Sequence, residues 1–177
     1  MRPVLELFWS LCTFRSGPER MPTASLFVIL VVASNLLVSM GVALSAPGIR
    51  SFMAAVSLPV VMAAVLAVTV WTALQIRGVP ARFTATFTAL MGADAMITAM
   101  QWPLLVLAGT PEAPPAAGIA TLLFLATLGL FAWWIAILGF VLSRALMVGR
   151  AQATALAILF TLMSMLVSSP FTAPEVT

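Results

Sequence analysis

Charged side chains are scarce in this chain of 177 residues. They make up 7% of the sequence, whereas hydrophobic residues make up 63%. A soluble domain carries roughly 25% charged residues. A water-soluble core does not need this much apolar surface, so lipid must be the solvent for most of the chain. The length suits a single domain.

The missing residue types exclude several kinds of site. The chain has no His and no Tyr, and its 8 basic residues are all Arg. Without imidazole there is no His ligand for haem or zinc and no Ser-His triad. Cys12 is the single cysteine, which leaves no internal disulfide and no CxxC. We also find no P-loop and no GxGxxG. We therefore expect no enzyme activity, no metal site and no resident cofactor. Bound lipid, quinone or pigment stays open, because an apolar pocket leaves no motif.

Five apolar stretches are long enough to cross a bilayer, which requires about 20 residues each. The connections between them are short, so neighbouring spans must run antiparallel. The sequence therefore predicts an all-α polytopic membrane protein with five transmembrane helices in a bundle over residues 25–169. A short external tail follows at 170–177. The expected spans cover residues 25–44, 52–76, 83–107, 119–143 and 151–169.

Residues 1–24 form the most polar part of the chain. Their first half repeats apolar residues at helical spacing, namely Val4, Leu5, Phe8, Leu11 and Cys12. About three turns of helix is too short to span a membrane. We therefore expect an amphipathic helix that lies at the membrane interface and ends before Gly17 and Pro18. A frayed tail is the simpler alternative.

The positions of the arginines indicate the orientation. If the N-terminus is inside, only Arg50 lies outside, together with Glu112 and Glu175. Cytoplasmic loops of membrane proteins carry the excess of positive charge. We therefore expect a cytoplasmic N-terminus and an external C-terminus, and the Ala, Arg, Pro and Val bias favours a bacterial cytoplasmic (inner) membrane. The arginines on the cytoplasmic side are Arg2, Arg15, Arg20, Arg77, Arg82, Arg144 and Arg150.

Small side chains mark the contact faces between the expected spans. Helices in a bilayer associate through close packing and hydrogen bonds, because lipid tails are as apolar as Leu. The 83–107 span is small on two neighbouring faces, so we expect it in the centre of the bundle. Its small residues are Ala85, Ala89 and Ala93 on one face and Thr84, Thr88 and Gly92 on the next.

Asp94 is the one ionisable residue inside an expected span. At about 1.5 Å per residue it lies roughly 16 Å from the cytoplasmic end of its helix. Asn35 in the first span and Thr161 in the fifth lie at roughly 15 Å, so the three polar side chains share one layer. An ionised carboxylate at this depth costs on the order of 2.5–3.5 kcal/mol. We therefore expect Asp94 to be protonated or to be hydrogen-bonded by Asn35.

A polar stripe continues from Asp94 toward the outer surface. Thr98 and Gln101 follow Asp94 at i+4 and i+7, on one face of the helix. Pro59 and Pro103 also fall in the outer half, where each removes a backbone hydrogen bond. A functional interpretation is a hydrated vestibule that leads to Asp94. A structural interpretation is a hydrogen bond that holds two helices together. In this case a neutral Asp94 bonds another span, and Gln101 reaches the headgroups.

Three stretches resemble a known family. FRSGPERMPTAS precedes the first span, FTALMGADAMITAM lies in the third, and WWIAILGFVLSRAL closes the fourth. They are similar to segments of small bacterial five-span membrane proteins of the Yip1-like class. The resemblance implies a five-helix membrane domain with a cytoplasmic N-terminus. Members often carry a polar or His-containing segment after the glycine of the fourth span, whereas residues 139–144 here lack His. Eukaryotic relatives are similar to trafficking factors that bind small GTPases, but no residue here supports that partner.

Two functions fit these observations. The first is a non-enzymatic integral membrane accessory or scaffold subunit, because almost no polypeptide lies outside the expected spans. The alternative is a small transporter or channel component with Asp94 as an intramembrane proton or cation site. The expected partners are the lipid bilayer and other integral membrane proteins, or a second copy of the chain. We expect no nucleic acid, because the net charge of +3 comes from arginines in short connections.

Overall fold

The computed structural model describes residues 2–45, 51–109 and 115–172. Within these ranges the ordered elements are all helical, and five helices are long and apolar enough to cross a membrane. The predicted fold class, an all-α membrane protein with five long helices and a short N-terminal helix, is therefore confirmed. Most of the expected tail at 170–177 falls outside the described residues.

The long helices lie where the apolar stretches predict them. α3 and α4 have the expected ends, and they run through Pro59 and Pro103 without a break. α5 and α6 are each a few residues longer than the spans inferred from hydropathy. The five helices are α2 (Ser25–Ser45), α3 (Phe52–Ile76), α4 (Phe83–Leu107), α5 (Ala117–Leu146) and α6 (Arg150–Thr172). The short elements are α1 (Arg2–Cys12) and the 3₁₀ turns η1 (Pro18–Arg20) and η2 (Pro80–Arg82).

Local sequence explains where several helices begin and end. Ser51 caps α3, because its hydroxyl accepts a hydrogen bond from the Ala54 amide at 3.1 Å. After α3 the chain turns at Gly78, whose φ of +69° is a left-handed conformation that glycine adopts without steric cost. Met147 has a left-handed φ of 55° and ends α5. These turns keep the connections between the long helices short.

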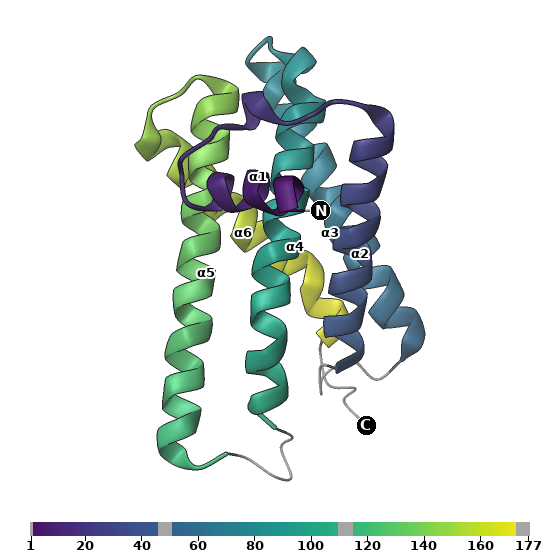
Figure 1. Ribbon diagram of the computed structural model, residues 1–177, viewed down its shortest axis with the longest axis vertical. Coiled ribbons are helices and arrows are strands. Elements are labelled where there is room, and N and C mark those ends of the chain that lie inside the picture. Colours follow the sequence, from purple (N-terminus) through teal and green to yellow (C-terminus); the bar gives the residue numbers. More distant parts are fainter. Residues whose placement is uncertain (1, 46–50, 110–114, 173–177) are drawn as a thin grey trace.

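α4 lies at the centre of the bundle, as the small residues of its sequence predict. It packs against α1, α2, α3 and α5 (Figure 1). Residues 88–93 are all buried, and because they follow one another around the helix, every side of α4 is covered at this level. Thr88, Ala89, Gly92 and Ala93 have little side-chain volume, which allows the neighbouring helices to approach closely.

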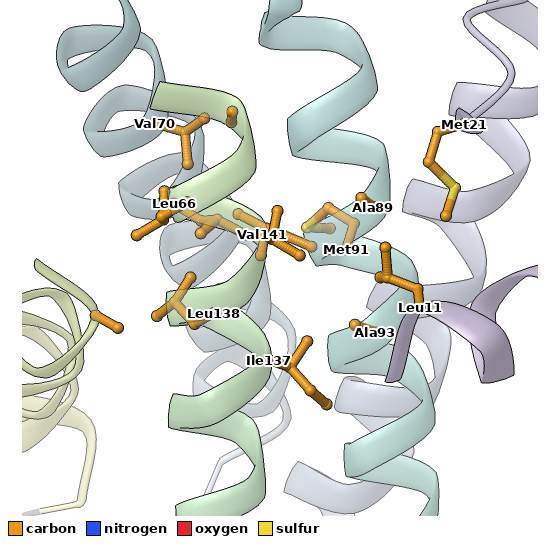
Figure 2. Close-up of a cluster of buried hydrophobic side chains, with 14 of the residues drawn as sticks. Leu11, Met21, Leu66, Val70, Ala89, Met91, Ala93, Ile137, Leu138 and Val141 are labelled. Carbon is orange, nitrogen blue, oxygen red and sulfur yellow. The ribbon is translucent and has the colours of Figure 1, made fainter. Parts of the chain in front are cut away.

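The packed core occupies the half of the bundle that bears the arginines. Figure 2 shows Leu66 and Val70 of α3, Leu138 and Val141 of α5, and Met91 of α4 in one cluster. These positions lie in the halves of α3 and α5 that lead to Arg77 and Arg144, and in the half of α4 that follows Arg82. Apolar side chains therefore form a tightly packed core in the arginine-bearing half, and the opposite half does not share this core.

α1 forms as expected. One face of this helix packs against the bundle, and the other face is exposed. Phe8, Leu11 and Cys12 are buried, whereas Leu5 and Trp9 remain exposed. Figure 1 shows α1 running across α4, between α5 and α2. The apolar face that the sequence assigns to lipid is thus divided, and its most buried residues contact the bundle.

Two contacts show that α1 lies some distance along the bundle from the arginine-bearing end. The Phe8 ring lies against Gly92, and a Cβ atom on Gly92 would collide with it. Gly92 lies roughly 14 Å along α4 from the first residue of that helix. The indole Nε1 of Trp133 in α5 donates a hydrogen bond to the Cys12 carbonyl at 2.9 Å. α1 therefore packs across α4 at roughly this distance from the arginine-bearing end of the bundle.

Candidate functional site

A cavity of about 410 Å³ lies in the half of the bundle that faces away from the arginines. Residues from α2, α3, α4, α5 and α6 all line it. Its walls are mainly apolar, and one group of polar side chains interrupts them. The polar side chains at the cavity are Asn35, Ser39, Asp94, Thr98, Thr161, Ser164 and Ser168.

Asn35 and Asp94 form the predicted link between the first and third spans. The Nδ2 atom of Asn35 donates to Oδ2 of Asp94 at 2.8 Å. The same Nδ2 donates to the Met91 carbonyl at 3.0 Å. Asn35 is buried, with 3% of its surface exposed, so its amide group has two fixed acceptors in place of water. The predicted hydrogen bond is therefore confirmed, and the two acceptors orient the Asn35 side chain.

Asp94 keeps a second carboxyl oxygen, Oδ1, for which no hydrogen bond occurs within the described part of the chain. No cation pairs with it there either, because the one ion pair of these residues joins Arg144 to Glu19. The carboxyl group is partly buried and borders the cavity. Asp94 thus presents hydrogen-bonding capacity to the cavity that the surrounding residues leave unused.

The other predicted site residues divide into two groups. Thr161 and Thr98 both line the cavity. The Thr161 hydroxyl is buried and donates to the Ala157 carbonyl of its own helix at 2.8 Å, so it borders the polar layer without bonding Asn35 or Asp94. Gln101 is not part of the cavity lining. The predicted stripe therefore reaches the cavity only as far as Thr98.

Sequence reasoning missed Ser39, Ser164, Phe131 and Trp134 as lining residues. Ser39 lies one helical turn after Asn35, and Ser164 lies three residues after Thr161, so helical spacing could have indicated both. The two aromatic residues left no such signal, because an aromatic residue in an apolar helix can face lipid, protein or a cavity. Their positions depend on how α5 is rotated in the bundle.

One hydroxyl at the cavity has no partner within the part of the chain that the structure describes. The Ser164 oxygen is fully buried and has no hydrogen-bond partner among the residues that the structure describes. Buried hydroxyl groups in proteins are almost always hydrogen-bonded, because an unpaired one costs free energy. Ser164 and the Oδ1 atom of Asp94 are therefore two polar groups at one cavity that a bound molecule or water could satisfy.

The volume and the lining of the cavity suit the binding of a small molecule. The cavity volume falls within the range of about 300–1,000 Å³ typical of small-molecule sites. A carboxyl group, an amide and hydroxyls could hold a cation or an ammonium group, and the apolar walls could hold a hydrocarbon body. Across residues 2–45, 51–109 and 115–172, no three His, Cys, Asp or Glu side chains cluster as they would around a metal ion.

Comparison with family models finds no match to this chain. Comparisons with curated proteins and with solved structures likewise find none. The resemblance to the Yip1-like class therefore stays a prediction from the three sequence segments.

Proposed function

We propose that this protein is a small membrane transporter or channel component that binds a small organic cation beside Asp94. The single observation that carries the proposal is the cavity, which joins apolar and aromatic walls to a carboxyl group that has no cationic partner among the described residues. A carboxylate inside a membrane is costly unless it is paired. A bound cation would offset that cost, and this gives Asp94 a role beyond the bond to Asn35.

The walls of the cavity favour an organic cation over a bare metal ion. Phe131 and Trp134 line it, and aromatic rings attract ammonium groups through their negative faces. Met62 and Leu66 add apolar surface for a hydrocarbon body. A volume of about 410 Å³ is also far larger than one dehydrated ion requires.

The position of the cavity supports access from the outer side. Several lining residues come from the outer halves of their helices, such as Ala43 near the end of α2 and Leu58 near the beginning of α3. We infer that the arginine-bearing end faces the cytoplasm of a bacterial inner membrane, as the positive-inside rule favours. A cation entering from the opposite side would meet Asp94 before it reached the packed core.

The test uses two probes with the same hydrocarbon body and different charge. Protein in mild detergent is titrated with 4-phenylbutylammonium and with 4-phenylbutanol, and tryptophan fluorescence reports binding because Trp134 lines the cavity. We expect the cation to bind and the alcohol to bind at least tenfold more weakly. Asp94→Asn should remove this preference, because an amide keeps the shape but not the charge.

Gln101→Leu is the matched control, because Gln101 lies on the same helix but outside the cavity. It should bind the cation as the wild-type protein does. Equal binding of the two probes to the wild-type protein, or an unchanged preference in Asp94→Asn, would reject the cation site. Uptake of the cation into proteoliposomes then separates transport from binding alone.

A second candidate, the accessory or scaffold subunit, has its own supporting observation. The outer half of α5 stands apart from the other helices in Figure 1. Nearly every residue from 116 to 129 is exposed, and a Cβ atom at Gly118 or Gly129 would meet nothing within 4 Å. Phe124 and Leu125 belong to this segment, which is an apolar surface that another membrane helix could cover.

The subunit candidate is tested by photocrosslinking in cell membranes. A crosslinker at Leu125, on the outer half of α5, should capture one protein at a defined mass if that surface has a partner. The same crosslinker at Ile76, which is also exposed but lies at the other end of the bundle, is the control. Capture of lipid alone at Leu125 would remove the observation that favours this candidate.

A further inference from the structure

A second cavity, of about 440 Å³, lies at the arginine-bearing end of the bundle. It is bounded by η1, by the beginning of α4 and by the end of α5, and Figure 1 shows η1 near the upper ends of these two helices. Its polar lining consists of Glu19, Arg82, Thr86, Ser143 and Arg144. The chemistry of this cavity differs from that at Asp94, because arginines dominate it.

Arg82 is held at the cavity by neutral acceptors. Its Nη1 atom donates to the carbonyl oxygens of Arg144 at 3.2 Å and Ala145 at 3.3 Å, at the end of α5. A guanidinium group carries five N–H donors. Those two bonds therefore orient the group and leave most of its donors for another acceptor, and its positive charge has no carboxylate partner among residues 2–45, 51–109 and 115–172.

Arg144 is paired only loosely. Its Nη1 atom lies 3.8 Å from Oε1 of Glu19, and each side chain is 58% exposed. An exposed pair at this separation contributes little to stability and is easily exchanged. The cavity thus combines two arginines with one carboxylate that a stronger anion could displace. Arg77 follows the last residue of α3, and Arg150 is the first residue of α6. Both lie at the same end of the bundle and add positive potential there.

We propose that this cavity binds the phosphate group of an anionic phospholipid. Arginine presents a planar set of donors that matches the oxygens of a phosphate. The cavity lies where two membrane helices end, at the level of lipid headgroups, and basic pockets between transmembrane helices bind anionic headgroups in this way. The apolar surface for the upper part of the lipid comes from the remaining lining residues, Pro18, Ala85, Ala145 and Met147.

Glu19 competes with the lipid for Arg144. Its carboxylate pairs with Arg144 when no lipid is bound, so the lipid phosphate must displace it. Removal of that charge should favour the lipid. Glu19 lies in η1, on the connection between α1 and α2, so lipid binding would also change what holds that connection to the bundle.

The experiment compares short-chain lipids of the same length on detergent-solubilised full-length protein. Dioctanoyl phosphatidylglycerol and dioctanoyl phosphatidylcholine are titrated separately, and native mass spectrometry counts the bound lipid. The wild-type protein should retain phosphatidylglycerol at least fivefold better than phosphatidylcholine. Arg82→Gln and Arg144→Gln should each weaken phosphatidylglycerol binding by about fivefold, which is the contribution expected of one arginine near the headgroups.

Arg150→Gln is the matched control, since Arg150 lies at the same end but outside the cavity lining. It should retain phosphatidylglycerol better than either cavity variant, and equal loss in all three would overturn the site.

Glu19→Gln leaves the arginines and the helix ends intact and should bind phosphatidylglycerol more tightly. Unchanged or weaker binding by Glu19→Gln would also overturn the proposal, even if Arg82→Gln failed to fold. Inorganic phosphate that displaces the lipid at equal concentration would identify a soluble-anion site instead.

Discussion

At the residue scale, the link between Asn35 and Asp94 has two separable roles. Asn35 donates to both Asp94 and the Met91 carbonyl, which ties α2 to α4. The other oxygen of Asp94, Oδ1, has no hydrogen-bond partner among the described residues, and Asp94 lines the cavity. A structural role requires only the first of these bonds, whereas a binding role requires the charge of Asp94. Substitutions that preserve one property and remove the other can therefore distinguish them.

Asp94→Leu should destabilise the protein by about 1 kcal/mol, because it leaves Asn35 without one of its acceptors. Asp94→Asn should keep the fold, because an amide also accepts a hydrogen bond. Combined with Asn35→Leu, these variants form a double-mutant cycle, and intramembrane polar pairs give coupling energies of about 0.6 kcal/mol on average and about 1.7 at most. Unfolding in a denaturing detergent measures each free energy. Zero coupling would mean that the bond contributes nothing to stability.

Cys12 provides a second test at this scale, because it is the only thiol in the chain. Burial raises the pKa of the Cys12 thiol from 9.0 to about 11, a difference of two pH units that lowers the thiolate fraction near pH 8 about one hundredfold. N-ethylmaleimide should therefore react slowly with the folded protein at pH 8. The rate should increase as the pH rises toward 11, and it should be fast at pH 8 after denaturation. Rapid labelling of the folded protein would contradict the burial.

At the scale of elements, α1 is the helix whose position depends most on packing. Its buried residues Phe8, Leu11 and Cys12 are spaced at i, i+3 and i+4, so they form one face. That face meets α4 at Gly92, where the absence of a Cβ atom makes room for the Phe8 ring. The docking therefore rests on the Phe8–Gly92 contact and on the hydrogen bond from Trp133 to the Cys12 carbonyl, and labelling of Cys12 reports whether it is intact.

Phe8→Ala should release α1 and increase the rate at which maleimide labels Cys12, because the ring fills the space beside Gly92. A buried Phe→Ala change typically costs about 3–5 kcal/mol. Leu5→Ala is the matched control on the same helix, since Leu5 is 60% exposed and should leave the rate unchanged. Equal rates in the two variants would show that Phe8 does not hold α1 in place.

At the scale of the whole molecule, the two halves of the bundle differ in packing. The half with the arginines contains the dense core around Leu90, Ile137 and Val141, all with 0% exposure. The other half contains the cavity beside Asp94, and it includes the separate outer part of α5. A densely packed half and a more open half suit a protein that binds molecules from one side, which is the arrangement that the proposed function requires.

Cysteine labelling tests the orientation of the whole chain. In a Cys12→Ala background, single cysteines replace Ala81 in η2 and Ala116 beside α5, both of which are exposed. In intact cells, a membrane-impermeant maleimide should label the cysteine at position 116 and should label that at position 81 only after the membrane is opened. Labelling of both from outside would contradict the five-span arrangement. Labelling of position 81 alone would reverse the orientation.

The sequence by itself determined the number, type and approximate ends of the long helices. Helix formation within a membrane depends on the length of the apolar run and on local turn residues, both of which are present in the linear order of the chain. Counting residues along a helix also gave the depth of Asn35 and Asp94, and depth was enough to predict their hydrogen bond. Small residues on two faces of α4 likewise predicted its central position.

Only the tertiary structure decided which side of each helix meets which neighbour. Helices that are apolar all round give no signal of their rotation, so Trp134 and Ser164 could not be assigned to a cavity from sequence. For the same reason, the sequence could not show that Gln101, which lies on the predicted stripe, does not line the cavity. The docking of α1 beside Gly92 joins residues far apart in the chain, and such contacts depend on shapes that form only when the whole bundle packs together.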